Sequence, residues 1–320
     1  MVPRTNRIVW FFAFGYFVCY AFYSALVKQV TDGAQVPGLS LLPAVTLGTA
    51  ITLPLLVASL GWWRVAPRFD ADTIIAGLAT GVIIVTTTLA YTFDGVSIVF
   101  ALLLLRGGVL ILAPVVDTLT GRGVRWFCWA ALLASMSGLF IALANAGDTR
   151  MTFVAVLNTS AYLAAYAVRL PRMTKSAKVS DPELTRRWFL GEMIIALAVQ
   201  LLLPLLAALT PAGAAIRGGI VSLRPAGLLV GVMYGFLYFF GTSVYLDRRE
   251  NTFCVPLNRG ASLLAGIVAT IAIGGTLRAS DLAGASLVIG ALLFLSPVHH
   301  LPETFFARIA RAARNKELLP

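Results

Sequence analysis

Long apolar runs alternate with short charged segments along the whole chain. Each run is close to the roughly 20 residues that a helix needs to cross the hydrocarbon core of a membrane. Backbone exposed to lipid must satisfy its hydrogen bonds internally, and these runs lack the alternation typical of strands. The pattern therefore predicts an all-α polytopic membrane protein with ten transmembrane helices. The runs are Ile8–Val27, Pro37–Trp62, Thr73–Thr92, Val96–Leu119, Trp126–Ala146, Met151–Val168, Trp188–Leu209, Pro225–Leu246, Thr252–Thr276 and Leu282–Val298.

The composition favours the same class. Of the 320 residues, 59% are hydrophobic and 12% are charged, and the mean hydropathy is +0.87. A soluble domain carries about 25% charged residues. The net charge of +11 is of the kind seen in nucleic-acid-binding proteins. Here, however, the basic residues flank the apolar runs instead of forming a binding stripe. We therefore expect membrane lipids, and no nucleic acid, as partners.

The distribution of Lys and Arg predicts the orientation. If both termini are cytoplasmic, 18 of the 25 basic residues lie on the inner side, and Arg169, Arg186 and Arg187 are among them. Five lie on the outer side, and two lie inside apolar runs. Because inner loops carry an excess of Lys and Arg, this split indicates an integral membrane protein with both termini in the cytoplasm. We expect the membrane to be a bacterial inner membrane, although the split itself does not identify the organism.

The chain also contains an internal repeat. The matched segments are Tyr16–Tyr20 with Tyr162–Tyr166, Gly77–Gly81 with Gly231–Gly235, and Arg106 with Arg259, at offsets of 146, 154 and 153 residues. Five helices per copy is an odd number, so the second copy must insert upside down relative to the first. Inverted repeats of this kind place the substrate near the midplane, between the two halves. The glycine pairs, spaced four residues apart, predict close approach of helix backbones.

The repeat divides the chain into four parts. We expect a first five-helix repeat at residues 1–168, a cytoplasmic linker at 169–187 and a second five-helix repeat at 188–298. Residues 299–320 form a cytoplasmic tail, where Phe305, Phe306 and Ile309 alternate with basic residues. Such an amphipathic helix is typical of segments that lie on the inner leaflet.

Two arginines inside apolar runs are the main candidates for a functional site. An arginine at mid-bilayer depth costs roughly 2.5–3.5 kcal/mol, so it usually faces a cavity or a partner. The guanidinium group stays protonated and offers a planar fork to a phosphate or carboxylate. Arg106 and Arg259 are therefore predicted to bind an anion, and internal ion pairing is the alternative.

Other residues complete the predicted site. The tyrosines fall inside predicted spans, where each hydroxyl needs a partner, so they suggest a polar, aromatic-lined pocket. Four of them, Tyr20, Tyr162, Tyr166 and Tyr238, are taken as substrate-binding candidates. Glu192 is a candidate for proton coupling, because burial in an apolar span favours the protonated carboxyl. An ion pair with Arg186 or Arg187 is the other interpretation of Glu192.

One stretch carries a family resemblance. The run Arg259-Gly-Ala-Ser-Leu-Leu-Ala-Gly-Ile-Val-Ala-Thr, followed by Leu282-Ala-Gly-Ala-Ser-Leu-Val-Ile-Gly-Ala-Leu, resembles the drug/metabolite transporter superfamily. The likeness is to its EamA-like members and to its nucleotide-sugar and triose-phosphate transporters. It implies ten helices in two inverted five-helix repeats. Leu257-Asn258-Arg259 is similar to a signature on the ninth helix of nucleotide-sugar transporters, which implies that Asn258 and Arg259 contact the ligand.

The leading functional hypothesis is a secondary transporter or exchanger. It would move an organic anion, such as a phosphorylated metabolite, by alternating access. A flippase for an anionic or phosphate-linked lipid is the alternative, since the same arginines would serve a phosphate headgroup. An intramembrane enzyme is disfavoured, because the chain contains no His-Glu-x-x-His and no Gly-x-Ser-x-Gly motif. We expect no catalytic residues, metal or cofactor, and the sequence is compatible with a homodimer.

Overall fold

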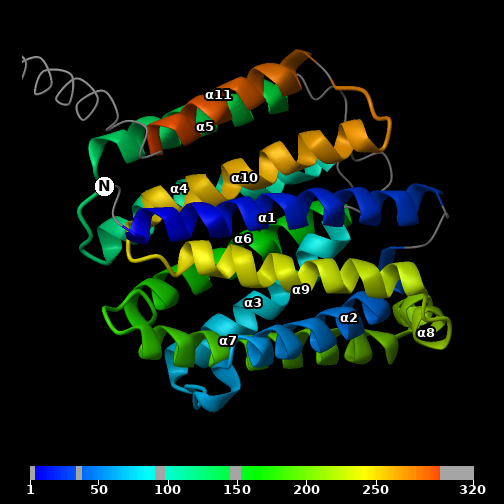
Figure 1. Cartoon of the computed structure of the whole chain (residues 1–320). Helices are drawn as coiled ribbons and strands as arrows, with labels where there is room; N and C mark the ends of the chain where they lie inside the picture. The colour runs from blue at the N-terminus through cyan, green and yellow to red at the C-terminus, as the bar shows by residue number, and fades with distance from the viewer. Residues whose placement is uncertain (1–3, 34–37, 91–97, 145–152, 278, 296–320) are drawn as a thin grey trace, which may run out of the picture.

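The computed structural model describes the chain except residues 1–3, 34–37, 91–97, 145–152, 278 and 296–320 (Figure 1). The predicted tail at 299–320 lies outside the described residues. Within them, the chain forms helices and no strands. The helices are α1 (Arg4–Lys28), α2 (Gly38–Ser59), α3 (Ala71–Ala90), α4 (Ile98–Leu119), α5 (Trp126–Ala144), α6 (Phe153–Ser176), α7 (Pro182–Ala208), α8 (Ala214–Val221), α9 (Pro225–Tyr245), α10 (Asn251–Ala272) and α11 (Ala279–Leu295). A π-helical turn, Gln29–Gly33, extends α1, and short 3₁₀ turns lie at Trp62–Arg64 and Pro211–Gly213.

Seven of the described helices are long and apolar enough to cross a membrane. Large apolar side chains remain on the outer surface of the bundle, for example Phe11, Phe14 and Phe22 at 63%, 64% and 65% exposure. Such a surface suits contact with lipid tails. The prediction of an all-helical membrane protein is confirmed.

Most of the predicted linker, residues 169–187, is helical in the structure. Helix α6 continues to Ser176 and α7 begins at Pro182, so only residues 177–181 connect them. Arg169 consequently lies inside α6, and its side chain is buried with 3% exposure.

The helices pack mainly in pairs from distant parts of the chain. Helix α2 lies along α9, and α3 lies along both α6 and α7. Helix α1 packs on α9 and α10, and α4 packs on α6 and α10. Helices α5 and α11 lie side by side at one edge of the bundle (Figure 1). The short α8 packs against α2.

Two of these interfaces depend on the predicted glycine pairs. A Cβ added to Gly77 would lie 2.5 Å from the Ile195 Cβ, in the contact between α3 and α7. A Cβ added to Gly231 would lie 2.3 Å from the Val45 backbone oxygen, in the contact between α9 and α2. Real Cβ contacts are longer than this, so only glycine lets these helices approach so closely. The predicted close approach is confirmed.

We expect Gly231→Ala to lower the apparent melting temperature of the purified protein. The added methyl group has a backbone oxygen in its way, and overpacking of this kind costs about 1–3 kcal/mol. Gly290→Ala on α11 is the matched control, because nothing lies within 4 Å of its added Cβ. Alanine is the better helix former, so that variant should be unchanged or slightly more stable. Equal melting temperatures for both variants would contradict the tight α2–α9 contact.

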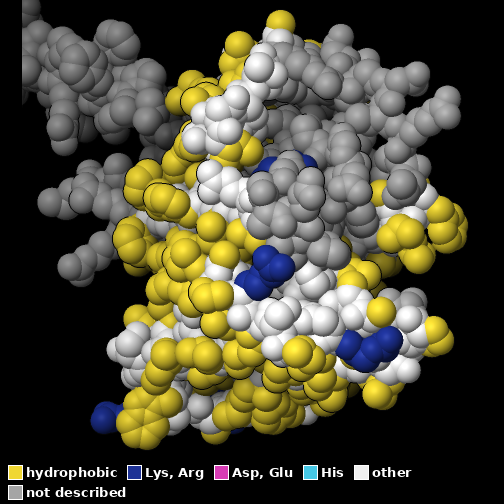
Figure 2. Space-filling model, turned by 90° about the vertical axis from the view of Figure 1, so that its right-hand side faces the viewer, with side chains coloured by type: hydrophobic (Ala, Val, Ile, Leu, Met, Phe, Trp, Pro, Cys, Tyr) yellow, Lys and Arg dark blue, Asp and Glu magenta, His cyan; other side chains and the backbone are white. Residues whose placement is uncertain are grey.

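One end of the bundle gathers most of the basic loops, and we call it the basic end. The connections 60–70, 120–125, 177–181 and 246–250 meet there. Arg122 donates to the backbone oxygens of Arg248 at 3.0 Å and Lys178 at 3.3 Å, and the Arg68 amide donates to Arg187 O at 2.9 Å. Figure 2 shows the opposite end, where Lys and Arg side chains are scattered singly among apolar and uncharged ones.

Two acids of the basic end hold the start of α10. The buried carboxylate of Asp117 accepts from the backbone amides of Asn251 at 2.9 Å and Thr252 at 2.7 Å, which caps the helix from α4. Burial would by itself raise the pKa of Glu250. Hydrogen bonds from Arg125 and Cys128 nevertheless hold that pKa below its ordinary value. These contacts fix the position of α10 two turns before Arg259.

Candidate functional site

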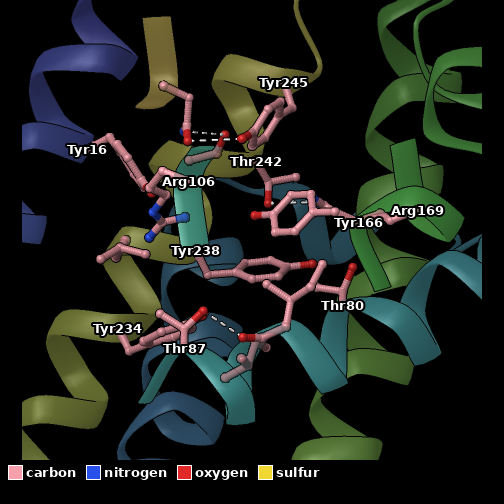
Figure 3. A pocket seen from close by; sticks show the side chains of 15 residues that line it. Tyr16, Thr80, Thr87, Arg106, Tyr166, Arg169, Tyr234, Tyr238, Thr242 and Tyr245 are labelled. Carbon is pink, nitrogen blue, oxygen red and sulfur yellow. Dashed lines mark hydrogen bonds between the residues drawn. The ribbon is translucent and has the colours of Figure 1, made fainter. Parts of the chain in front are cut away.

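A small cavity of about 40 Å³ lies in the middle of the bundle, and we call it the central cavity. Its walls come from α1, α3, α4, α6, α9 and α10, so both halves of the chain contribute to it. Figure 3 shows Arg106 on one side and Arg169 on the other, with the rings of Tyr166 and Tyr238 between them in this view. The polar lining residues are Tyr16, Thr80, Thr87, Arg106, Tyr166, Arg169, Tyr234, Tyr238, Thr242, Tyr245 and Asn258. A water molecule needs at least about 10–15 Å³, so this polar space has room for a few waters.

Arg106 lines the central cavity from α4 and is 2% exposed. Its guanidinium group donates one hydrogen bond to the Tyr162 hydroxyl at 2.6 Å and another to the Tyr20 hydroxyl. The guanidinium carbon also lies 5.0 Å from the centre of the Tyr20 ring. Tyr20 and Tyr162 are not among the lining residues, so they position Arg106 from behind. Both hydrogen bonds go to neutral hydroxyl groups.

Arg259 is fully buried in α10 and is held differently. Its guanidinium carbon lies 4.6 Å from the centre of the Tyr166 ring and 5.6 Å from that of Tyr245. None of its three nitrogens has a hydrogen-bond partner among the described residues. Cation–π contacts are worth up to about 2 kcal/mol in a dry site. That falls short of the several kcal/mol that burying an ion costs.

Arg259 is predicted to bind the substrate, but its side chain does not line the central cavity. Arg259 itself is not among the lining residues, whereas both rings that it contacts are. Tyr166 and Tyr245 therefore separate this guanidinium group from the cavity.

Asn258, the neighbour of Arg259, does line the cavity. Its side-chain oxygen accepts from the Tyr245 hydroxyl at 3.1 Å, and its amide nitrogen lies 3.5 Å from Gly241 O. These bonds tie α10 to α9. Tyr166 and Tyr238, also predicted for the site, line the cavity as well.

Glu192 is buried in α7 and is paired with Arg169, not with Arg186 or Arg187. The Arg169 Nε lies 2.5 Å from Glu192 Oε1, and Nη2 lies 3.2 Å from Oε2. The Thr80 hydroxyl donates to the same carboxylate at 2.6 Å. Interpretation of Glu192 as a boundary partner of Arg186 or Arg187 is therefore wrong.

The sequence places Arg169 in the predicted linker, so its position in the wall of the central cavity was not predicted. The signal was in the sequence, because Arg169 lies three residues after Tyr166 and seven after Tyr162, on the same face of a helix. An apolar run that is extended by one turn at its end would have included it.

The fold and the central cavity define a helical membrane protein with a cationic, tyrosine-lined hollow between its halves. The sequence matches no protein-family model and no curated protein. A solved structure described only as "Crystal structure of protein" has a similar fold. The TM-score is 0.59 at 17% sequence identity, over 88% of this chain and 94% of that chain. At such low identity the similarity extends to the fold alone.

Proposed function

We propose that this protein is a secondary transporter or exchanger that moves an organic anion across the membrane by alternating access. The observation that carries the proposal is Arg259, a fully buried guanidinium group without a hydrogen-bond partner among the described residues. Ionisable groups at membrane depth are costly and are found mainly at functional sites. Both rings that cover Arg259 belong to the wall of a polar cavity that also holds Arg106.

The proposal includes ten transmembrane helices in two inverted five-helix repeats. The first consists of α1 to α5, and the second of α6, α7, α9, α10 and α11. Helix packing supports this arrangement. If each helix of the first set is exchanged with the helix at the same position in the second set, main helix contacts become other contacts that the structure also contains. The α2–α9 contact becomes α7–α3, α1–α9 becomes α6–α3, and α1–α10 becomes α6–α4.

Side-chain contacts also match when each residue is replaced by its counterpart in the other repeat. Arg106 lies over the ring of Tyr20, and its repeat counterpart Arg259 lies over the ring of Tyr166, the counterpart of Tyr20. The glycine pairs behave alike, since Gly77 serves the α3–α7 contact and Gly231 the matching α9–α2 contact. Two arginines at matching positions, each beside the matching tyrosine of its own repeat, support one anion site built from both repeats.

The family and the orientation belong to the same proposal. Inverted five-helix repeats and the run from Arg259 favour the drug/metabolite transporter superfamily. The basic end would face the cytoplasm, because Lys and Arg are retained on the inner side of membranes. Both termini would then be cytoplasmic, in a bacterial inner membrane.

Transport requires the central cavity to widen. Pockets for organic ligands have volumes of about 300–1,000 Å³, compared with 40 Å³ for the central cavity. An incoming anion would meet Arg106 first. Withdrawal of Tyr166 and Tyr245 would let Arg259 reach the same anion from the other repeat. Glu192 would compensate the positive charge of Arg169.

The experiment that tests this function is uptake into liposomes that contain the purified protein. A panel of labelled organic phosphates and dicarboxylates should include at least one that accumulates. Arg106→Gln should then reduce uptake by at least about 30-fold, because a lost charge pair in a dry site costs 2 kcal/mol or more. Arg64→Gln, which removes an exposed charge at the basic end, is the control. Unchanged uptake in Arg106→Gln would remove this residue from the site.

A flippase for an anionic or phosphate-linked lipid is the second candidate. It is favoured by a wide groove at the basic end, described below, where apolar and arginine side chains meet. In the same liposomes, a labelled anionic lipid would change leaflets without uptake of any soluble anion. Release of a covalently altered product would instead indicate an enzyme.

A further inference from the structure

A second and much larger hollow, of about 620 Å³, lies at the basic end, and we call it the basic-end groove. It is formed by the starts of α1 and α7, the 3₁₀ turn Trp62–Arg64, the end of α9 and the connection from α9 to α10. This is the end of the bundle at which α1 begins, marked N in Figure 1. Its volume falls within the range of ligand pockets, about 300–1,000 Å³.

The rim of the groove is positively charged. Arg186, Arg248 and Arg249 line it, and Asp247 is the one acid among the described lining residues. Asp247 is already paired with Arg249, at 2.6 Å. Two guanidinium charges therefore face the groove without an acid from its described lining.

The two remaining arginines have donors to offer. Arg186 is exposed, and its guanidinium carbon lies 5.6 Å from the centre of the Trp62 ring. Arg248 is exposed and donates from one nitrogen to the backbone oxygen of Ser180. A guanidinium group has five N–H donors, so each keeps several for a phosphate.

The wall of the groove is apolar and leads to the outer surface. Ile8, Phe12, Trp62 and Leu246 line it, and Ile8 is 52% exposed. Ile8 and Phe12 are four residues apart on α1, with Phe11 at 63% exposure beside them. Residues at this spacing share one face of a helix. The wall therefore continues into an apolar surface of the kind that contacts lipid tails.

We propose that the basic-end groove binds an anionic phospholipid. The phosphate lies between Arg186 and Arg248, and the glycerol and the first carbons of the acyl chains lie against Ile8, Phe12 and Trp62. Basic pockets between transmembrane helices suit lipid headgroups of this charge. A soluble phosphate would leave the apolar wall uncovered, and a zwitterionic lipid would bring its own cation towards the arginines.

Lipid binding to the full-length protein, purified and delipidated in a neutral detergent, tests the proposal. Phosphatidylglycerol is titrated and the bound lipid is counted by native mass spectrometry. We expect one tightly retained molecule and much weaker retention of phosphatidylcholine. Arg186→Gln and Arg248→Gln should each weaken the binding about fivefold, and the double variant about 25-fold.

Lys175→Gln is the control, because it removes a charge from the same end, outside the groove, on a side chain that is 78% exposed. Equal retention of phosphatidylcholine, or wild-type binding by the double variant, would overturn the proposal. If millimolar inorganic phosphate stabilises the protein as much as phosphatidylglycerol does, the groove binds a soluble anion, and the lipid proposal is overturned too. Anion uptake by the double variant is measured in parallel, and we expect it to persist. A failure of the lipid site is thereby distinguished from a failure of the transport proposal.

Discussion

Arg259→Met is expected to abolish anion uptake while the protein stays as stable as the wild type or becomes more stable. The guanidinium group is fully buried and has no hydrogen-bond partner among the described residues, so we expect its burial to cost stability. Methionine has a similar length and no charge to desolvate. Replacing buried ionic groups by apolar side chains is often neutral, or stabilising by about 1–4 kcal/mol. Uptake into liposomes and the melting temperature in detergent measure the two effects.

Loss of uptake together with unchanged or higher stability is the result expected for a residue that is kept for function at a cost in stability. Arg259→Lys is the informative second variant, because it keeps the charge but loses the planar fork and the stacking on Tyr166. We expect it to fold and to retain only part of the uptake. A less stable Arg259→Met protein with normal uptake would show that the cation–π contacts serve the fold alone.

Arg169→Met is expected to have the opposite effect on stability. The substitution leaves the Glu192 carboxylate buried without its counter-charge, and breaking a buried ion pair in this way costs about 3–5 kcal/mol. The double variant Arg169→Met/Glu192→Gln removes both charges and should recover most of the lost stability. The apparent melting temperatures of the single and double variants measure this coupling.

Arg172→Met, three residues further along α6, is the control for Arg169→Met. Its guanidinium group donates to the Val168 oxygen of its own helix, so we expect little change in melting temperature. A double variant no more stable than Arg169→Met would contradict the ion-pair account. Proton coupling by Glu192 remains a separate proposal. It predicts that anion uptake by the double variant no longer responds to a proton gradient.

The apolar runs alone do not predict the contrast between these two arginines, although the spacing from Tyr166 places Arg169 on the same helix face. Arg259 stands inside an apolar run, and Arg169 stands at the end of one, shortly before Arg172 and Lys175. The neighbouring sequence therefore suggests a buried site for the first and a loop for the second. In the structure both are buried, and the one at the end of the run has the acid partner.

The sequence by itself determined the helices and some of their contacts. Helical hydrogen bonds join residues four apart, so the length and apolar character of a run are enough to predict a helix in lipid. Each predicted run overlaps a described helix, although α6 extends past its run and the short α8 lies in none of the runs. The glycine pairs Gly77–Gly81 and Gly231–Gly235 lie at close helix contacts. Both features depend on neighbours along one helix.

Only the tertiary structure decided which side chains meet around the central cavity. That Arg169 reaches Glu192, and that Tyr166 and Tyr245 cover Arg259, depends on how each helix is rotated and where it crosses the others. The same holds for the basic-end groove, whose arginines come from α7 and the connection between α9 and α10, and whose apolar wall comes largely from α1. These contacts join residues far apart in the chain, and no local pattern specifies the distance between them.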